Sequence, residues 1–296
     1  MAGGLFQRHL ALLPPAEQQQ VLEFLQPADK YRASCSRIMQ RCAVSVALGV
    51  PWPEVALART KGRKPFTTNA KPPYAPNFNF NGRYVVLAAE PLALVGVDVA
   101  APRSARPGPA AARPLEQHLR IFRPQFADSE WALLEGLAGH AERQEAAFQS
   151  LWSLKEAFIK ARGDGLGFSP LSRAAFELPQ PGGDGGHIGS ASQMQVAAPA
   201  ALDASGGNVQ SAALLLDGVR QSRWRFELHT LPADHCVAVA LGPPADAVDE
   251  IGVFKATLGF ATYVPDPNDR PKASGGPAFQ TTSLRQLLVQ AGMAEG

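Results

Sequence analysis

The stretch that decides the fold is Trp152-Ser153-Leu154-Lys155-Glu156-Ala157-Phe158-Ile159-Lys160-Ala161-Arg162-Gly163-Asp164-Gly165-Leu166-Gly167-Phe168. Apolar residues recur in and just before it at the three- and four-residue spacing of a helix face. We therefore predict a helix over residues 142–162 that ends at Gly163, where a left-handed cap suits glycine. Its predicted core stripe consists of Phe148, Leu151, Trp152 and Ile159. The same helix carries Lys155, Glu156 and Lys160, so it brings charged groups to the edge of the core.

A second carboxylate lies upstream, in Gly96-Val97-Asp98-Val99. We predict that Asp98 ends a strand over residues 93–99. An Asp from a strand and a Glu from a helix, with lysines nearby, suit a divalent metal that carries phosphates. Each residue also has a simpler interpretation. Asp98 would serve as a turn residue, and Glu156 with Lys160 would form an ordinary surface pair one helical turn apart.

A basic turn, Arg59-Thr60-Lys61-Gly62-Arg63-Lys64-Pro65, is the other candidate for phosphate binding. Arginine offers bidentate geometry to phosphate and lysine offers a point charge. Alternating glycines at 163, 165 and 167 would let backbone come close to a ligand phosphate or to a docked partner. The alternatives are a solvated loop for the basic turn and a plain flexible turn for the glycines.

The composition is that of a soluble globular protein, with 296 residues, 46% hydrophobic and 18% charged. A formal net charge of +2 is too small to favour a nucleic-acid partner. No run has the length of a membrane-spanning helix and no secretory signal precedes the fold, so we expect a cytoplasmic protein. Organelle targeting stays open, because no acidic residue precedes Glu17. The three cysteines lack metal-binding spacing, so neither zinc nor a disulfide framework is expected.

The remaining pattern predicts an α+β fold. Further helices are expected at residues 15–26, 29–48, 115–122, 128–138 and 283–291. Further strands are expected at residues 55–60, 84–90, 174–178, 211–217, 223–230 and 235–241. We predict two α/β halves, 1–101 and 115–244, joined by a proline-rich linker over 102–114 and followed by a largely irregular tail over 245–296. A disordered loop is expected at 180–210, which is rich in Gly, Ala and Ser.

Four motifs in this order resemble a known family. They are Asn77-Phe78-Asn79-Phe80-Asn81, the apolar run 84–91, Gly96 to Val99 and Trp152 to Lys160. Over about residues 29–242 the chain is similar to the 4′-phosphopantetheinyl transferases, in particular to the large, broad-specificity type of eukaryotes. The resemblance implies two similar halves related by a pseudo-twofold axis, with coenzyme A and Mg²⁺ between them. It also implies transfer of phosphopantetheine from coenzyme A to a serine of an apo acyl carrier protein, by a monomeric enzyme.

The resemblance also assigns roles to single residues. Asp98 and Glu156 match the Mg²⁺ ligands, and Glu156 and Lys160 match the catalytic residues, with Glu156 as the base for the serine hydroxyl. The residues that match contacts to coenzyme A are Arg59, Lys61, Gly62, Arg63, Lys64, Asn79, Lys155 and Lys160.

The chain departs from the family pattern next to the Asn-Phe-Asn run. The family carries a Ser-His pair there, with a Gln in close relatives, whereas Asn81 is followed directly by Gly82 and Arg83. The third position of the metal pattern is Ala100, and Gln20 stands near the place of an expected arginine. Two functions therefore stay open. One is an active transferase with weakened binding, and the other is an impaired member that only binds coenzyme A or a carrier protein.

Overall fold

The computed structural model describes residues 2–69, 77–81, 84–90, 92–105, 113–178, 209–258, 279 and 281–293. The helices are α1 (Ala2–Ala11), α2 (Pro15–Leu22), α3 (Pro27–Leu48), α5 (Leu115–Phe122), α6 (Asp128–Gly136), α7 (Ala141–Arg162), α8 (Val253–Ala256) and α9 (Leu284–Gln290). The strands are β1 (Leu57–Arg59), β2 (Pro65–Thr67), β3 (Asn77–Asn81), β4 (Tyr84–Ala88), β5 (Leu94–Ala100), β6 (Ala174–Glu177), β7 (Gln210–Leu216), β8 (Val219–Arg220), β9 (Arg225–Leu231) and β10 (His235–Gly242). The loop predicted at 180–210 lies outside the described residues except for its last two.

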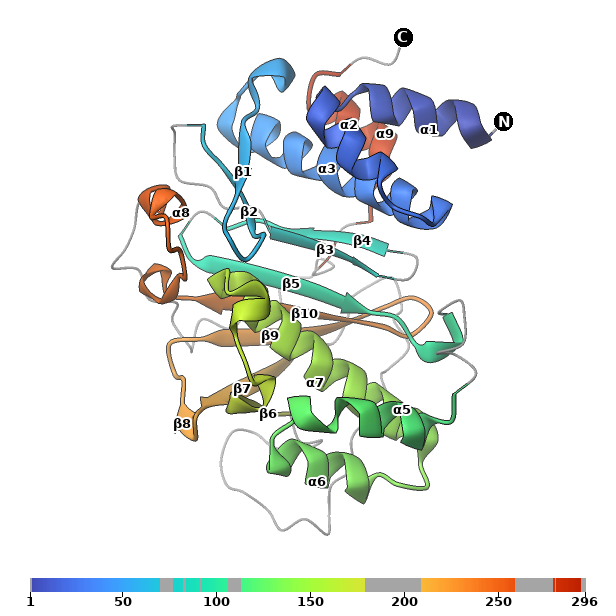
Figure 1. Ribbon diagram of the computed structural model, residues 1–296, viewed down its shortest axis with the longest axis vertical. Helices are drawn as coiled ribbons and strands as arrows, with labels where there is room; N and C mark the ends of the chain where they lie inside the picture. Colours follow the sequence, from blue (N-terminus) through green and yellow to red (C-terminus); the bar gives the residue numbers. More distant parts are fainter. Residues whose placement is uncertain are drawn as a thin grey trace.

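The elements form layers (Figure 1). Helices α1, α2, α3 and α9 gather at one end of the molecule, the strands cross its middle, and α5 and α6 lie at the other end. The main sheet has the order β5-β10-β9-β7-β6, with β8 paired to β7, and its neighbouring strands are antiparallel. Two hairpins, β1–β2 and β3–β4, complete the described strands. This mixed architecture is the α+β class that the sequence predicts.

The main sheet is built from both predicted halves. Strand β5, from the 1–101 half, pairs with β10, from the 115–244 half, and Asp98 lies opposite Ala238. The two halves therefore share one sheet instead of each having a separate one. The pseudo-twofold axis stays a prediction.

The two faces of β5 have different partners, because alternate side chains of a strand point to opposite faces. Val95, Val97 and Val99 pack in a cluster with Val86 of β4. On the other face Gly96 and Asp98 meet α7. Strand β5 thus lies between the β3–β4 hairpin and α7, and it presents its one carboxylate to the helix.

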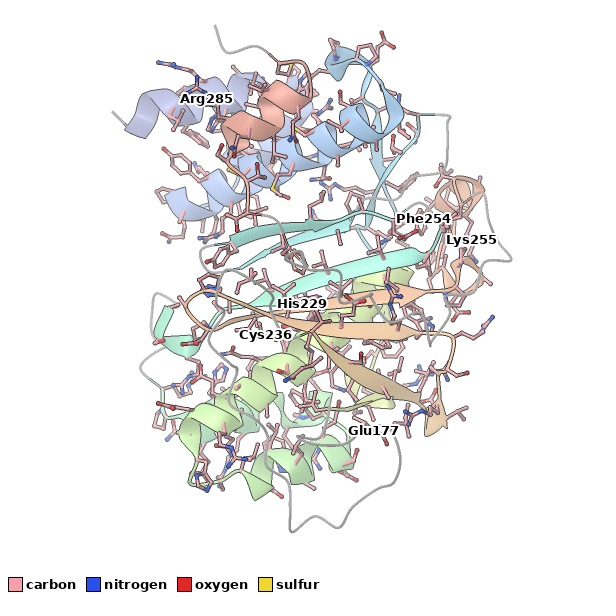
Figure 2. All side chains as sticks on the ribbon, turned by 180° about the vertical axis from the view of Figure 1, so that it is seen from behind. Glu177, His229, Cys236, Phe254, Lys255 and Arg285 are labelled. Atoms are coloured by element: carbon pink, nitrogen blue, oxygen red, sulfur yellow. The ribbon has the colours of Figure 1, made fainter. Side chains whose placement is uncertain are left out.

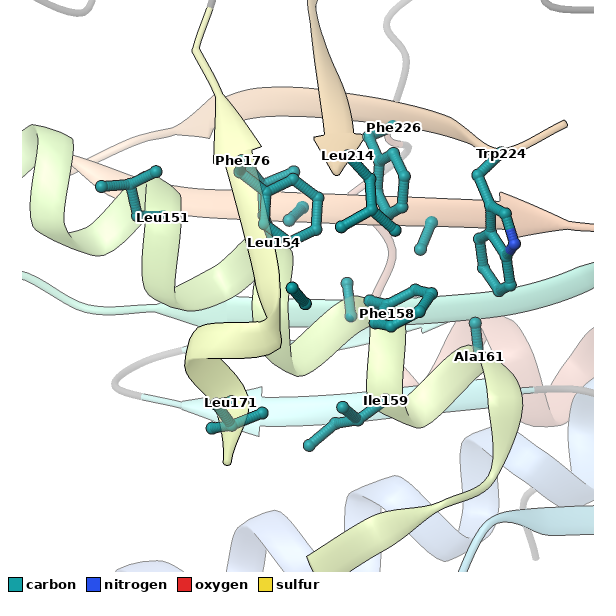
Figure 3. Close-up of a cluster of buried hydrophobic side chains, with 14 of the residues drawn as sticks. Leu151, Leu154, Phe158, Ile159, Ala161, Leu171, Phe176, Leu214, Trp224 and Phe226 are labelled. Atoms are coloured by element: carbon teal, nitrogen blue, oxygen red, sulfur yellow. The ribbon is translucent and has the colours of Figure 1, made fainter. Parts of the chain in front are cut away.

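The core is centred on α7 (Figure 3). Leu151, Leu154 and Phe158 are fully buried against Phe176, Leu214 and Phe226 of the sheet. Burial of each such large side chain stabilises the fold by about 1.5–3 kcal/mol, so the helix is held firmly in place. The predicted core stripe is confirmed for Phe148, Leu151 and Ile159, while Trp152 is half-buried and stacks on Phe148.

Several elements differ from the sequence predictions. Helix α1 was not expected, because its two glycines disfavour helix formation even though Phe6 and Leu10 share one buried face. The short strands β2, β3 and β8 were not expected either. The helix predicted at 283–291 is confirmed as α9, and its Leu288 is buried beside α1–α3. No helix in the described part of the chain combines the length and apolar character needed to cross a membrane.

Candidate functional site

Helix α7 and strand β5 bring two carboxylates and a lysine together. Lys160 Nζ lies 2.6 Å from Asp98 Oδ1 and 3.8 Å from Glu156 Oε2. Asp98 is 4% exposed, and Glu156 and Lys160 are half-buried. The juxtaposition of these three residues is therefore the one that the sequence predicts. Asp98 does not end its strand, however, because β5 continues to Ala100.

Burial perturbs the acid–base chemistry of this group. Desolvation raises the pKa of Glu156, the nearby Lys160 ammonium lowers it, and the charge of Asp98 raises it. The net pKa of Glu156 lies above its ordinary value. A partly buried carboxylate with a raised pKa is a stronger proton acceptor than an exposed one.

The donor set fits one small divalent cation. No group of three or more His, Cys, Asp or Glu side chains with metal-binding geometry occurs among the residues that the structure describes. Asp98 and Glu156 nevertheless flank a cation already, since the Lys160 ammonium lies within 4 Å of both. Mg²⁺ usually keeps several waters and takes one or two carboxylates plus substrate phosphates, so two carboxylates suffice.

Glu156 and Lys160 of this group border a cavity of about 520 Å³. Its walls are the basic turn 59–65, the last turns of α7 with Glu156 and Lys160, the glycine segment 163–167 and residues 248–250 of the C-terminal tail. The structure thus joins the basic turn with Glu156 and Lys160 in one site, although they are far apart in sequence.

The glycines bring two backbone segments into contact. A β-carbon on Gly62 would lie 2.0 Å from the carbonyl oxygen of Gly163, and one on Gly165 would lie 2.6 Å from that of Gly62. Gly163 also has the left-handed conformation expected at the end of the helix, with φ of 91°. The glycines thus allow close contact with the basic turn of the same chain, and the use of this segment for a ligand phosphate or a docked partner stays a prediction.

The basic turn borders the cavity with Arg59, Lys61, Arg63 and Lys64. Burial lowers the pKa of Arg59, while the charge of Glu17 raises it. Lys61 is exposed, and its ammonium lies 2.7 Å from the carboxylate of Glu250 in the tail. An exposed pair of this kind contributes little to stability, so Lys61 can exchange Glu250 for another anion at small cost.

Lys155 does not border the cavity, which corrects its assignment to phosphate binding. Its side chain is fully buried, and Nζ lies 2.8 Å from Glu130 Oε2 and donates to the carbonyl oxygens of Leu171 and Ala174. Glu130 also accepts from the backbone N–H of Phe176 at 2.9 Å. The pair ties α7 to α6 and β6. Helix geometry already indicates from the sequence that Lys155 points into the core, since it lies about 40° from Leu151 on the core-facing side.

Two further residues assigned to coenzyme A need separate treatment. Lys64 is 4% exposed, and its ammonium donates to the carbonyl oxygens of Val95 at 2.8 Å and Lys160 at 3.1 Å. The structure thus turns this ammonium toward backbone. Asn79 lies on β3 opposite Val86, and the structure describes only its backbone. Its assignment stays a prediction.

The tail contributes a wall that sequence reasoning missed. Val248 N–H donates to the carbonyl oxygen of Arg162 at 2.8 Å, which fixes the tail to the end of α7. Asp249 and Glu250 then border the cavity beside the basic turn, where Glu250 pairs with Lys61. The acidic pair complements that turn, but nothing in the sequence indicates that the two segments meet.

Comparison with known proteins gives consistent matches along the chain. A family model described as "4'-phosphopantetheinyl transferase, N-terminal" matches residues 4–92, and one described as "4'-phosphopantetheinyl transferase superfamily" matches residues 94–240. The L-aminoadipate-semialdehyde dehydrogenase-phosphopantetheinyl transferase of Pongo abelii is 33% identical over 78% of this chain and 68% of its own length. The Homo sapiens protein of that name is 32% identical over the same shares. A phosphopantetheinyl transferase of a Thraustochytrium species is 32% identical over 77% of this chain and 70% of its own.

Proposed function

Because the chain belongs to the 4′-phosphopantetheinyl transferase superfamily, we propose that it is a holo-acyl-carrier-protein synthase, which moves 4′-phosphopantetheine from coenzyme A to a serine of an apo acyl carrier protein. One observation carries the proposal. Glu156 and Lys160 line a cavity that the basic turn also borders, and the buried Asp98 meets Lys160 directly behind that wall. That combination places acid–base groups beside groups that bind phosphate.

The cations that border the cavity suit the phosphates of coenzyme A, while four carboxylates border it as well: Glu156, Asp164, Asp249 and Glu250. Arg59, Lys61 and Arg63 supply cations along one wall, and Lys160 supplies one at the carboxylates. Phosphate groups are bound well by arginine forks and lysine point charges. The cavity volume of about 520 Å³ is within the usual range of small-molecule sites.

The chemistry divides between Glu156 and Lys160. Asp98 and Glu156 would hold Mg²⁺, which neutralises charge on the pyrophosphate when it is bound. Glu156 accepts the proton of the serine hydroxyl, and a bound cation keeps it ionised for that role. The serine oxygen forms a bond to the β-phosphorus while the bond to adenosine 3′,5′-bisphosphate breaks. Lys160 stabilises the negative charge on the phosphoryl oxygens.

The acceptor is proposed to be a carrier protein or a carrier domain. The names of the relatives from Pongo abelii and Homo sapiens refer to L-aminoadipate-semialdehyde dehydrogenase, an enzyme whose name points to lysine metabolism. Carriers of fatty-acid biosynthesis are the second acceptor class. We propose a monomer that acts in the cytoplasm and binds neither nucleic acid nor membrane.

A transfer assay read by intact-protein mass spectrometry tests the proposal. Purified chain is incubated with coenzyme A, Mg²⁺ and apo acyl carrier protein, beside Glu156→Gln and beside a carrier whose acceptor serine is alanine. We expect the mass increase of one phosphopantetheine, lost with chelator, with Glu156→Gln and with the serine variant. No transfer under any condition contradicts the proposal.

A second protein separates the two functions left open by the sequence. It carries Ile-Ser-His-Gln inserted after Asn81, where the family has the Ser-His segment. Transfer by both proteins supports the active enzyme. Transfer only by the protein with the insertion supports the impaired member, which would bind coenzyme A without turnover.

A further inference from the structure

Lys64 is part of the basic turn in the sequence, but its ammonium points toward the protein backbone, unlike that of Lys61. It is 4% exposed, whereas the side chain of Lys61, three residues earlier, is 72% exposed and pairs with Glu250. The Lys64 ammonium donates to the carbonyl oxygens of Val95 and Lys160, at 2.8 and 3.1 Å. Each acceptor is backbone.

The carbonyl of Lys160 is one that the helix itself leaves without a partner. The last four carbonyls of an α-helix have no intrahelical donor, and α7 ends at Arg162. The N–H of Gly163 donates to Ile159 at 2.9 Å, that of Val248 donates to Arg162 at 2.8 Å, and Lys64 supplies the donor for Lys160. A cation at a helix C-terminus is also favoured by the helix dipole.

The other acceptor belongs to the strand that carries Asp98. Val95 precedes Asp98 by three residues on β5, while Lys160 carries the ammonium that meets Asp98. Lys64 therefore bonds the backbones of the two elements that bring the site together. Gly96 lets those backbones approach, since a β-carbon there would lie 2.0 Å from the carbonyl oxygen of Ala157.

A buried aromatic residue from the tail closes the space around this ammonium. Lys64 Nζ lies 5.7 Å from the ring centroid of Phe254, which is fully buried and packs on Phe66 with 5.4 Å between ring centroids. Figure 2 shows Phe254 on α8, at the side of the β1–β2 hairpin. A cation near an aromatic face is favoured most when it is desolvated. Lys64 borders the cavity, but its ammonium is engaged by two backbone carbonyls and lies beside the Phe254 ring.

We propose that Lys64 is a positioning residue of the transferase, which ties β5 to the end of α7 and thereby sets the approach of Asp98 to Glu156 and Lys160. Its ammonium holds these backbone carbonyls and does not bind a phosphate of coenzyme A. This inference deepens the proposed function and rests on it.

Acetylation of lysines on the unaltered protein tests the contact. The chain is treated briefly with acetic anhydride at pH 8, with and without saturating coenzyme A, and modified lysines are quantified by peptide mass spectrometry. Burial lowers the pKa of Lys64 to about 7, so at pH 8 only enclosure would protect its amine. We expect Lys64 to stay unmodified in both samples, and Lys61 to be modified in the free protein and protected by coenzyme A.

The outcomes separate the positioning role of Lys64 from the binding of coenzyme A in this cavity. Modification of Lys64 in the free protein, with protection by coenzyme A, would overturn the positioning role. Unprotected Lys61 together with unmodified Lys64 would count against coenzyme A in this cavity and would leave the burial of Lys64 intact.

Two variants test the consequence for the reaction. Lys64→Met keeps the aliphatic stem and removes the donors, and Lys61→Met is its exposed counterpart on the same turn. We expect Lys64→Met to lower kcat at least ~10-fold, because small misplacements of reacting groups are costly, with the calorimetric Kd for coenzyme A changed less than about threefold. Lys61→Met should instead weaken coenzyme A binding and leave kcat closer to that of the unaltered protein. The reverse pattern, weakened binding in Lys64→Met with kcat unchanged, would contradict the inference. If Lys64→Met does not fold, the acetylation experiment decides alone.

Discussion

A β-carbon on Gly96 of β5 would lie 2.0 Å from the carbonyl oxygen of Ala157 on α7. Strand and helix are therefore in direct backbone contact at the point where Asp98 meets Lys160. The geometry of the site depends on this contact, because neither backbone can give way without moving a charged side chain.

Gly96→Ala tests that contact. The added methyl group would also lie 2.5 Å from the backbone nitrogen of Ala161, so the helix or the strand must move. We expect a loss of about 3 kcal/mol or more in the free energy of unfolding, at the upper end of overpacking costs, together with loss of transfer activity. Urea denaturation measures the first effect. Gly136→Ala is the control, because nothing lies within 4 Å of its added carbon, and it should be neutral or slightly stabilising.

Gly62→Ala tests the docking of the basic turn. Its β-carbon would lie 2.0 Å from the carbonyl oxygen of Gly163, so the turn should move away from the end of α7. We expect binding of coenzyme A to weaken by about 10-fold or more, since one displaced charge-assisted hydrogen bond is worth roughly 1.5–3 kcal/mol. Calorimetric titration gives the Kd. Gly167→Ala has nothing within 4 Å and should bind as the unaltered chain does. Equal Kd values for the two variants would show that the turn does not bind the ligand.

The two lysines of α7 should respond differently to the same substitution. Lys155→Met leaves Glu130 buried without its cation, which typically costs 3–5 kcal/mol. Lys160→Met takes the ammonium from the buried Asp98, so it should lose transfer activity and some stability, but less stability than Lys155→Met because Lys160 itself is half-buried. Thermal unfolding and the transfer assay separate the two. The double substitution Glu130→Gln with Lys155→Met should recover part of the lost stability, and failure to recover it would argue against the pair as the cause.

The sequence predicts the helix and the strand that hold the site residues. It predicts less well which residues these elements contact in the folded protein. Helix α7, strand β5 and the cap at Gly163 follow from periodicity and glycine chemistry, and the approach of Asp98 to Glu156 and Lys160 follows from them once strand and helix pack. Lys155 shows the limit of resemblance. A motif assigns it to phosphate, yet its place on the helix directs it into the core, toward Glu130.

The tail and the basic turn show where local patterns carry no information. Val248 and Glu250 reach the site only because the chain returns past the end of α7. The one feature of the sequence that hints at this contact is the acidic pair Asp249-Glu250, which suits the charge of the basic turn. The inward turn of Lys64 likewise depends on acceptors 31 and 96 residues away in sequence. Contacts of that range are set by tertiary packing and not by propensity.

Glu156→Gln should separate stability from activity. Burial and the charge of Asp98 raise the pKa of Glu156, so the folded protein binds its proton more tightly than the unfolded chain does. Its carboxylate therefore destabilises the fold once pH rises above the ordinary glutamate pKa. We expect metal-free Glu156→Gln to have a higher Tm than the unaltered chain at pH 7, with the difference shrinking as pH falls below 5, and no transfer activity. An unchanged Tm difference between pH 4 and pH 7 would contradict the raised pKa.

Lys64 gives the opposite dependence on pH. Burial lowers its pKa to about 7 from 10.5, so below pH 7 the ammonium is charged in both states and the cost of burying it is fully present. Between pH 7 and 10.5 the unfolded chain holds a proton that the folded protein has released, so the free energy of unfolding rises with pH by up to about 1.4 kcal/mol per unit. The Lys64→Met variant lacks the titrating amine of Lys64 and keeps every other titratable group of the unaltered chain.

Urea denaturation of both proteins at pH 7, 8 and 9 should therefore show the free energy of unfolding of the unaltered chain rising relative to that of the variant. The range stops at pH 9 because burial raises the pKa of Cys42 and Cys236 above 9.0, which lowers stability at higher pH in both proteins. Parallel curves over that range would mean that the ammonium keeps an ordinary pKa, as it would if it pointed into water.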